Sequence, residues 1–111
     1  MFESLFGNKK DNSIAASAVK GKLDSKDSFL LFDVRTPEEY AGGHIEHSIS
    51  LPLQALPQHV SKYARSKDKE IVVYCQSGAR SSRAAAELAQ MGYTNVKNLG
   101  GITSWPYAVV R

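Results

Sequence analysis

The chain has 111 residues, of which 42% are hydrophobic and 23% are charged, so its length and composition predict one globular domain rather than a disordered or fibrous chain. Its formal net charge of +3 is modest and its basic residues are scattered among acidic ones, which argues against a nucleic-acid partner. No segment is as long as an apolar membrane span and the first residues lack the pattern of a secretion signal, so we expect a cytoplasmic protein with no membrane span.

The first two expected elements are a helix and a buried strand. Asn12 or Ser13 can cap a helix whose apolar residues share one face and which ends near Gly21. The run FLLFDV at 29–34 then predicts a strand. Its nearly continuous apolar character is typical of a strand that is covered on both faces.

A short helix with a strong start signal follows this strand. Thr36 is expected to be its N-cap and Pro37 its first helical residue, and Glu39 completes a capping box. Gly42 and Gly43 end it, because glycine favours the end of a helix.

The rest of the chain continues to alternate between strands and helices. We expect an extended piece at 48–53, a helix from Pro57 to Ala64, a strand at 70–75, a helix from about Ser81 to Gly92, a strand at 94–99 and a final segment in which Trp105 covers the core. Alternating apolar strands and helices predict the α/β class, with a mainly parallel sheet and helices on both faces.

Cys75 is the only cysteine, so the chain cannot form an internal disulfide. His44, His47 and His59 lack the spacing of metal ligands, and we therefore expect no metal and no cofactor. Any chemistry that uses a thiol must go through Cys75.

Cys75 stands at the end of the strand at 70–75, where parallel sheets place their ligand sites. Gly78 lets the next residues turn so that their amides face the sulfur, and these amides, the positive end of the following helix and Arg80 would all stabilise a thiolate. The expected loop and helix start consist of Gln76, Ser77, Gly78, Ala79, Arg80 and Ser81. The alternative is that Cys75 is only a small buried apolar residue.

Three segments together resemble the single-domain rhodaneses, a sulfurtransferase family. They are FDVRTPEEYAGGHIEHSISLPL, VVYCQSGARSSRAAAELAQMGY and VKNLGGITSW, and the similarity extends from Ile14 to Trp105. The resemblance implies a rhodanese-like domain over residues 13–111 with a five-stranded sheet, preceded by a flexible N-terminal extension at 1–12.

The resemblance also implies a reaction. The Cys75 thiolate would take the outer sulfur of thiosulfate or of another donor and would hold it as a persulfide. Arg80 would attract the anionic donor or the departing sulfite. Because there is no second cysteine, the sulfur must pass to an external acceptor, which can be cyanide, a small thiol or a protein thiol.

Two other functions stay open. One is a persulfide carrier or a rhodanese-like binding module that serves a partner protein. The other is a phosphatase or arsenate reductase, since related enzymes also combine a cysteine and an arginine around an anion-binding loop. In those enzymes five residues separate the two, whereas four separate Cys75 from Arg80, which favours a smaller cradle around sulfur.

Supporting roles follow from the same resemblance. Asp33 is expected to bond to the backbone of the loop, and Arg35 to pair with a carboxylate such as Glu39. His44 is expected to fix its own loop rather than to act as a base. Some relatives that prefer thiosulfate carry a basic residue where Ser77 stands, so the resemblance does not extend to a strong preference for thiosulfate.

Overall fold

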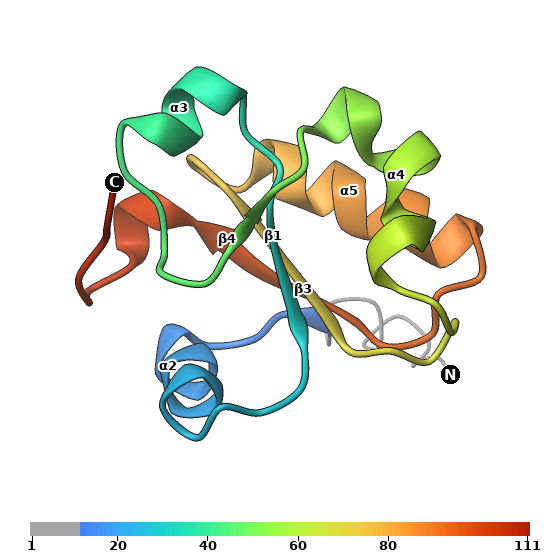
Figure 1. Ribbon diagram of the computed structural model, residues 1–111, viewed down its shortest axis with the longest axis horizontal. Coiled ribbons are helices and arrows are strands. Elements are labelled where there is room, and N and C mark those ends of the chain that lie inside the picture. Colours follow the sequence, from blue (N-terminus) through green and yellow to red (C-terminus); the bar gives the residue numbers. More distant parts are fainter. Residues whose placement is uncertain (1–11) are drawn as a thin grey trace, which may run out of the picture.

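The computed structural model describes residues 12–111, which form a four-stranded parallel sheet between helices (Figure 1). The strands are β1 (Leu30–Asp33), β2 (Ile49–Ser50), β3 (Ile71–Cys75) and β4 (Val96–Gly101), in the spatial order β2-β1-β3-β4. The expected α/β class with a parallel sheet is confirmed. Among residues 12–111 no helix has both the length and the apolar character needed to cross a bilayer.

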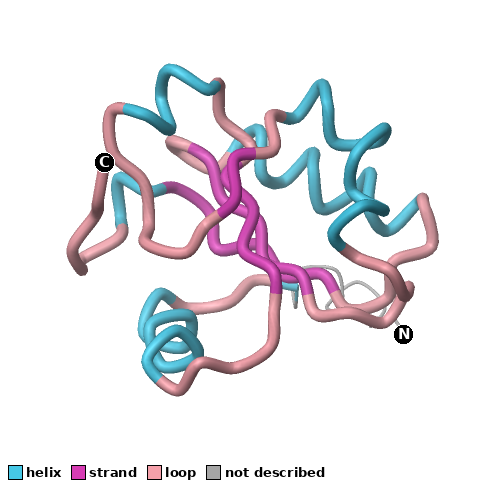
Figure 2. Tube along the Cα trace, in the orientation of Figure 1, coloured by secondary structure: helices cyan, strands magenta, loops and turns pink. Residues whose placement is uncertain are grey.

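The helices lie on both sides of the sheet. The helices are α2 (Ala16–Asp24), α3 (Pro37–Ala41), α4 (Leu56–Tyr63) and α5 (Ala79–Gln90). Helix α2 covers one face, α4 and α5 cover the other, and α3 follows the carboxyl end of β1 (Figure 1). The strands form one twisted layer between these two groups (Figure 2).

Strand β3 lies at the centre of two apolar clusters, one on each face of the sheet. Its residues Ile71, Val73 and Cys75 belong to the cluster under α4 and α5, whereas Val72 and Tyr74 belong to the cluster under α2. All five are at most 1% exposed. This burial on both faces explains why the strand is apolar throughout, since successive side chains of a strand point to opposite faces.

The sheet has four strands in the described residues, not the five expected. Where a fifth strand would lie beside β4, the structure has a single parallel bridge between Ser13 and Asn98, and the amide of Ile14 donates to the carbonyl of Asn98. The chain turns into α2 only two residues later, so pairing stops after this one bridge. The expected extension at 1–12 falls, apart from Asn12, outside the described residues.

The boundaries of helices α2 and α5 also differ from expectation. Helix α2 begins at Ala16 rather than directly after Asn12 or Ser13, the two expected caps, because Ser13 is held by the bridge to Asn98, and the helix continues past Gly21 to Asp24. Helix α5 begins at Ala79, two residues before Ser81. By contrast, the capping box of α3 is formed as expected and the helix ends at Ala41, directly before Gly42.

Candidate functional site

Cys75 lies at the carboxyl end of β3, between β1 and β4 in the sheet. Its neighbour Tyr74 pairs with Asp33 at the end of β1, so the functional side chains expected on these two strands do meet at one edge. Cys75 is only 1% exposed, whereas Gln76, Ser77 and Ala79 in the loop that follows are exposed. The sulfur therefore sits at the base of an exposed loop.

The loop turns its amides toward the sulfur, as the glycine predicted. Gly78 has a φ of +114° and is the N-cap of α5. The Gly78 amide nitrogen lies 3.0 Å from Cys75 Sγ, the Ser81 amide nitrogen lies 3.3 Å from it, and both donate to the sulfur. A β-carbon at position 78 would be strained at this φ, so glycine suits the start of this helix.

The Ser81 hydroxyl adds a donor that responds to the charge of Cys75. Its Oγ is 3.6 Å from Sγ and 3.1 Å from the carbonyl oxygen of Gly78, and Ser81 is fully buried. While the sulfur is a thiol, the hydroxyl accepts from it and donates to the carbonyl. After deprotonation the same hydroxyl can turn and donate to the thiolate.

Two opposing effects set the pKa of Cys75. Burial is the larger single effect and raises it, because a charged thiolate loses solvation. Hydrogen bonds from the Ser81 hydroxyl and from the amides of Ser81, Gly78 and Arg80 act in the other direction, and together they hold the pKa below its usual value. The site therefore favours a thiolate, which is the nucleophilic form of cysteine.

The end of β4 forms the wall against which the loop packs. A β-carbon on Gly101 would lie 2.5 Å from the carbonyl oxygen of Gln76 and 2.8 Å from the Cα of Ser77, so only glycine fits there. The same Gln76 carbonyl accepts from the amide of Thr103 at 3.3 Å and from its hydroxyl at 3.2 Å. Sequence reasoning treated these residues as strand and turn and missed this role; the glycine pair in LGG was the available signal.

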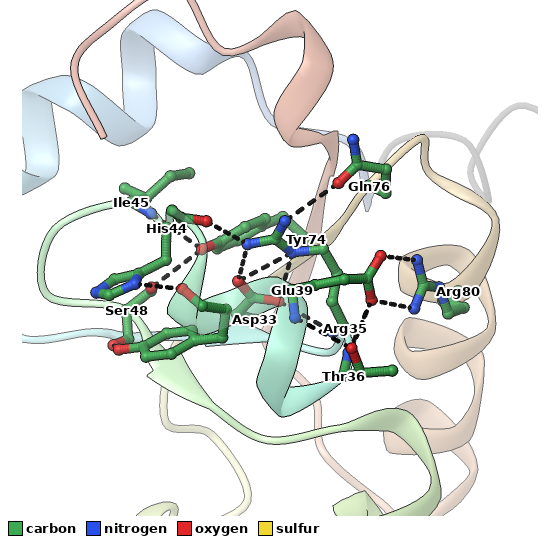
Figure 3. A network of polar contacts seen from close by, with 12 residues as sticks. Asp33, Arg35, Thr36, Glu39, His44, Ile45, Ser48, Tyr74, Gln76 and Arg80 are labelled. Carbon is green, nitrogen blue, oxygen red and sulfur yellow. Dashed lines mark hydrogen bonds and ion pairs between the residues drawn. The ribbon is translucent and has the colours of Figure 1, made fainter. Parts of the chain in front are cut away.

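Arg35 supports the loop, but through partners other than the one expected. Its guanidinium forms a buried ion pair with Asp33, in which Nη2 lies 2.7 Å from Oδ2, and it also donates to the Gly43 carbonyl and to Gln76 Oε1 (Figure 3). Arg35 therefore pairs with a carboxylate, as expected, but this carboxylate is Asp33, and Glu39, the expected example, is not its partner. The carboxylate of Asp33 accepts hydrogen bonds from the guanidinium and from the backbone amide of Arg35. The expected hydrogen bond between Asp33 and the backbone of the loop is not formed.

Glu39 pairs instead with Arg80. The two side chains form a bidentate contact, with 2.8 Å between Nη1 and Oε1 and 3.1 Å between Nη2 and Oε2 (Figure 3). The side chain of Arg80 thus points toward helix α3, whereas its backbone amide faces the sulfur. This contact joins the start of α5 to the start of α3.

A group of aromatic and hydroxyl side chains orders the segment after α3. Buried Tyr74 accepts from the amide of Ile45 at 3.1 Å, and its hydroxyl lies 3.0 Å from Ser48 Oγ (Figure 3). His44 stacks on Tyr40, and its Nδ1 donates to the Tyr40 carbonyl at 2.8 Å. The contacts of His44 agree with a residue that fixes the conformation of its own loop. That His44 does not act as a base stays a prediction.

Comparisons with known proteins agree with this geometry. A family model described as the rhodanese-like domain matches residues 15–107. A sulfurtransferase from Allochromatium vinosum is 42% identical over 95 residues, covering 85% of this chain and 87% of that protein. A thiosulfate sulfurtransferase from Escherichia coli is 37% identical over 70 residues, covering 63% and 67%. The solution structure of a rhodanese-like domain from Anabaena superposes with a TM-score of 0.81 at 26% identity, covering 89% of this chain and 78% of that one.

Proposed function

Since the chain belongs to the rhodanese-like domain family, we propose that it is a sulfurtransferase that carries a sulfane sulfur as a persulfide on Cys75. The observation that carries this proposal is the cradle around Sγ, in which the amides of Gly78 and Ser81 donate to the sulfur at 3.0 and 3.3 Å. Relatives named sulfurtransferases support the same reaction class. The donor is thiosulfate or another sulfane sulfur compound.

In the first half-reaction the Cys75 thiolate attacks the outer sulfur of the donor. With thiosulfate, a bond forms between Sγ and this sulfur, the sulfur–sulfur bond of thiosulfate breaks, and sulfite leaves with the electron pair. The terminal sulfur of the resulting Cys75 persulfide carries the negative charge. Preorganised amides and the N-terminus of α5 stabilise that charge without the cost of reorienting water.

In the second half-reaction an external nucleophile removes the sulfur. Cyanide attacks the terminal sulfur, the persulfide bond breaks, and thiocyanate and the Cys75 thiolate are formed; a small or protein thiol reacts in the same way and becomes a persulfide. Because the chain has one cysteine, no internal thiol competes for the sulfur. The two half-reactions predict parallel initial-rate lines, and intersecting lines would contradict this order.

Intact mass spectrometry tests the proposal. After incubation with thiosulfate the protein should gain one sulfur, about 32 Da, and should lose it when cyanide is added. Cys75→Ser should show no gain, and wild-type protein alkylated at Cys75 serves as a second control with the native sequence. No gain with either thiosulfate or a thiol persulfide would contradict the proposal, and hydrolysis of an aryl phosphate that requires Cys75 would favour the phosphatase alternative.

A cytoplasmic location stays a prediction from the sequence.

A further inference from the structure

The charge of the loop arginine is already neutralised by a carboxylate in this structure. Both oxygens of Glu39 contact the guanidinium of Arg80, at 2.8 and 3.1 Å, and the two side chains are about equally exposed, at 33% and 35%. A bidentate contact of this kind fixes the direction of the guanidinium as well as its charge. In this structure the guanidinium of Arg80 is therefore bonded to Glu39 rather than to the sulfur.

Glu39 is held in place independently of Arg80. Its Oε1 accepts from the amide of Thr36 at 2.9 Å, and its own amide donates to the Thr36 hydroxyl, so the capping box of α3 orients the carboxylate. The hydrogen bond from Arg80, followed by that from the Thr36 amide, lowers the pKa of Glu39 to about 2. The carboxylate stays charged at every pH at which the thiolate would react.

Arg35, beside the loop, and Arg83, on the exposed surface of α5, are also paired with carboxylates. Arg35 is 4% exposed and its guanidinium is bonded to Asp33, to Gly43 and to Gln76. Arg83, on the first turns of α5, lies 3.4 Å from Glu87. What faces the sulfur directly is a set of uncharged donors, namely the loop amides and the Ser81 hydroxyl.

Such a site suits a donor with little charge better than a dianion. Thiosulfate carries two negative charges and its leaving group is the sulfite dianion, so it gains more from an unpaired cation than a monoanion does, and Glu39 neutralises the charge of Arg80. A thiol persulfide reacts by the same bond changes: Sγ bonds to the outer sulfur, the sulfur–sulfur bond breaks, and a thiolate leaves with the electron pair. Its leaving group carries one charge.

Building on the proposed function, we propose that Glu39 is a specificity-determining residue that holds Arg80 away from the donor and thereby favours thiol persulfides over thiosulfate. Glu39 acts through Arg80 and not by contact with the sulfur or the donor, so it is a positioning residue. Its effect is to fix the position of the charged guanidinium of Arg80.

Glu39→Gln tests this proposal because it removes the charge while keeping the shape. Glutamine also completes a capping box with threonine, so α3 should keep its N-cap. We expect the second-order rate constant for sulfur uptake from thiosulfate to rise about two- to fivefold, the range that an exposed ion pair can supply. Uptake from the persulfide of 2-mercaptoethanol should change by less than about twofold, and both rates are read by quenched-flow intact mass spectrometry.

Two further variants make the result specific. Glu87→Gln removes the same charge from the exposed pair with Arg83 and should leave both uptake rates within about 1.5-fold of wild type. In the double variant Glu39→Gln with Arg80→Gln the gain with thiosulfate should disappear, because the freed arginine is its source. The gain should also shrink as salt rises from 0.1 to 1 M, where the screening length falls from about 10 to about 3 Å.

The outcomes separate this inference from the function on which it rests. If wild type and Glu39→Gln both form the Cys75 persulfide but have the same preference between the two donors, the role of Glu39 is refuted and the sulfurtransferase proposal stands. An equal gain in Glu87→Gln, or a gain that persists without Arg80, also refutes it. If neither donor places sulfur on Cys75, both proposals fail together.

Discussion

Cys75 owes its lowered pKa to hydrogen bonds rather than to a nearby free cation. The two arginines that flank the loop, Arg35 and Arg80, are each paired with a carboxylate, and the donors at Sγ are amides and one hydroxyl. Ser81 supplies two of these donors, its amide and its side chain. Removing the side chain alone therefore measures how much of the pKa shift the hydroxyl supplies.

Ser81→Ala should move the pH profile of sulfur uptake to higher pH. The thiolate fraction rises with pH through the pKa of the folded protein, and without the hydroxyl this pKa returns toward that of an ordinary cysteine. We expect uptake at neutral pH to fall about tenfold, with much of the loss recovered above pH ~9. The matched control is Ser61→Ala, at an exposed position of α4, whose profile should equal that of wild type. A parallel loss at every pH in Ser81→Ala would contradict the prediction.

The same pKa shift links protonation to stability. A thiol whose pKa is lower in the folded protein than in the unfolded chain stabilises the fold at pH values above the unfolded pKa. This contribution is lost as the pH falls through the folded pKa. Stability due to Cys75 should therefore be complete in alkaline solution and lost toward acid.

Asp33→Asn should destabilise the protein strongly. Both members of the pair with Arg35 are buried, so the change leaves a cation without its partner, at a cost of about 3–5 kcal/mol in the free energy of unfolding. Asp24→Asn breaks an exposed pair with Lys20 and should cost less than about 0.5 kcal/mol. Urea unfolding measures both, and equal costs would show that burial of the first pair does not matter.

At the scale of elements, the loop after Cys75 lies where three of them meet. Strand β3 supplies Cys75, helix α5 supplies the amide donors, and the end of β4 lies against the loop at Gly101. The Gln76 carbonyl, held by Thr103, ties the loop to the segment after β4. The position of the amides around the sulfur thus depends on a strand that carries no reacting group.

Gly101→Ala should lower sulfur uptake on the order of 10- to 100-fold, because the added β-carbon overlaps the backbone of the loop and displaces the amides from the sulfur. Gly21→Ala is the matched control. Gly21 lies within α2, and a β-carbon added there would meet no atom beyond its own stretch of helix within 4 Å, so the change should leave uptake unaltered and stabilise the protein by about 0.5–1 kcal/mol. Normal uptake in Gly101→Ala would show that the wall does not set the loop geometry.

At the scale of the whole molecule, one central strand joins two apolar clusters. Leu31 lies in the cluster under α2 and Leu88 in the cluster under α4 and α5, and both are at most 2% exposed. Because β3 contributes side chains to both clusters, neither can be disrupted without disturbing the strand that ends in Cys75. The domain should therefore unfold as one unit.

Leu31→Ala and Leu88→Ala should each lower the free energy of unfolding by about 2–5 kcal/mol while a single transition is retained. Circular dichroism and tryptophan fluorescence of Trp105, followed in urea, should give coincident curves for both variants. Val109→Ala, at a site that is 48% exposed, should stay within about 0.5 kcal/mol of wild type. Separate transitions for the two clusters would contradict a single cooperative unit.

Features that depend on neighbours in sequence were predictable. The capping box at Thr36 and Glu39, the buried strand before Cys75 and the turn at Gly78 all follow from residues within a few positions of one another. Some pairings of side chains were missed or wrong. Glu39 was the example given for the carboxylate that pairs with Arg35, but that partner is Asp33, two residues away. Glu39 pairs instead with Arg80, 41 residues away, and no local signal indicates this contact.

The sequence by itself determined the class of the fold, the position of Cys75 at the end of a buried strand and the turn at Gly78, because apolar periodicity, caps and the glycine act over short distances along the chain. Only the tertiary structure decided which carboxylate pairs with which arginine and which glycine forms the wall of the loop. Glu39 and Arg80 are 41 residues apart, and Gly101 meets Gln76 across the end of the sheet. Such contacts depend on the packing of β1, β3, β4 and α5 together, which is a property of the folded chain.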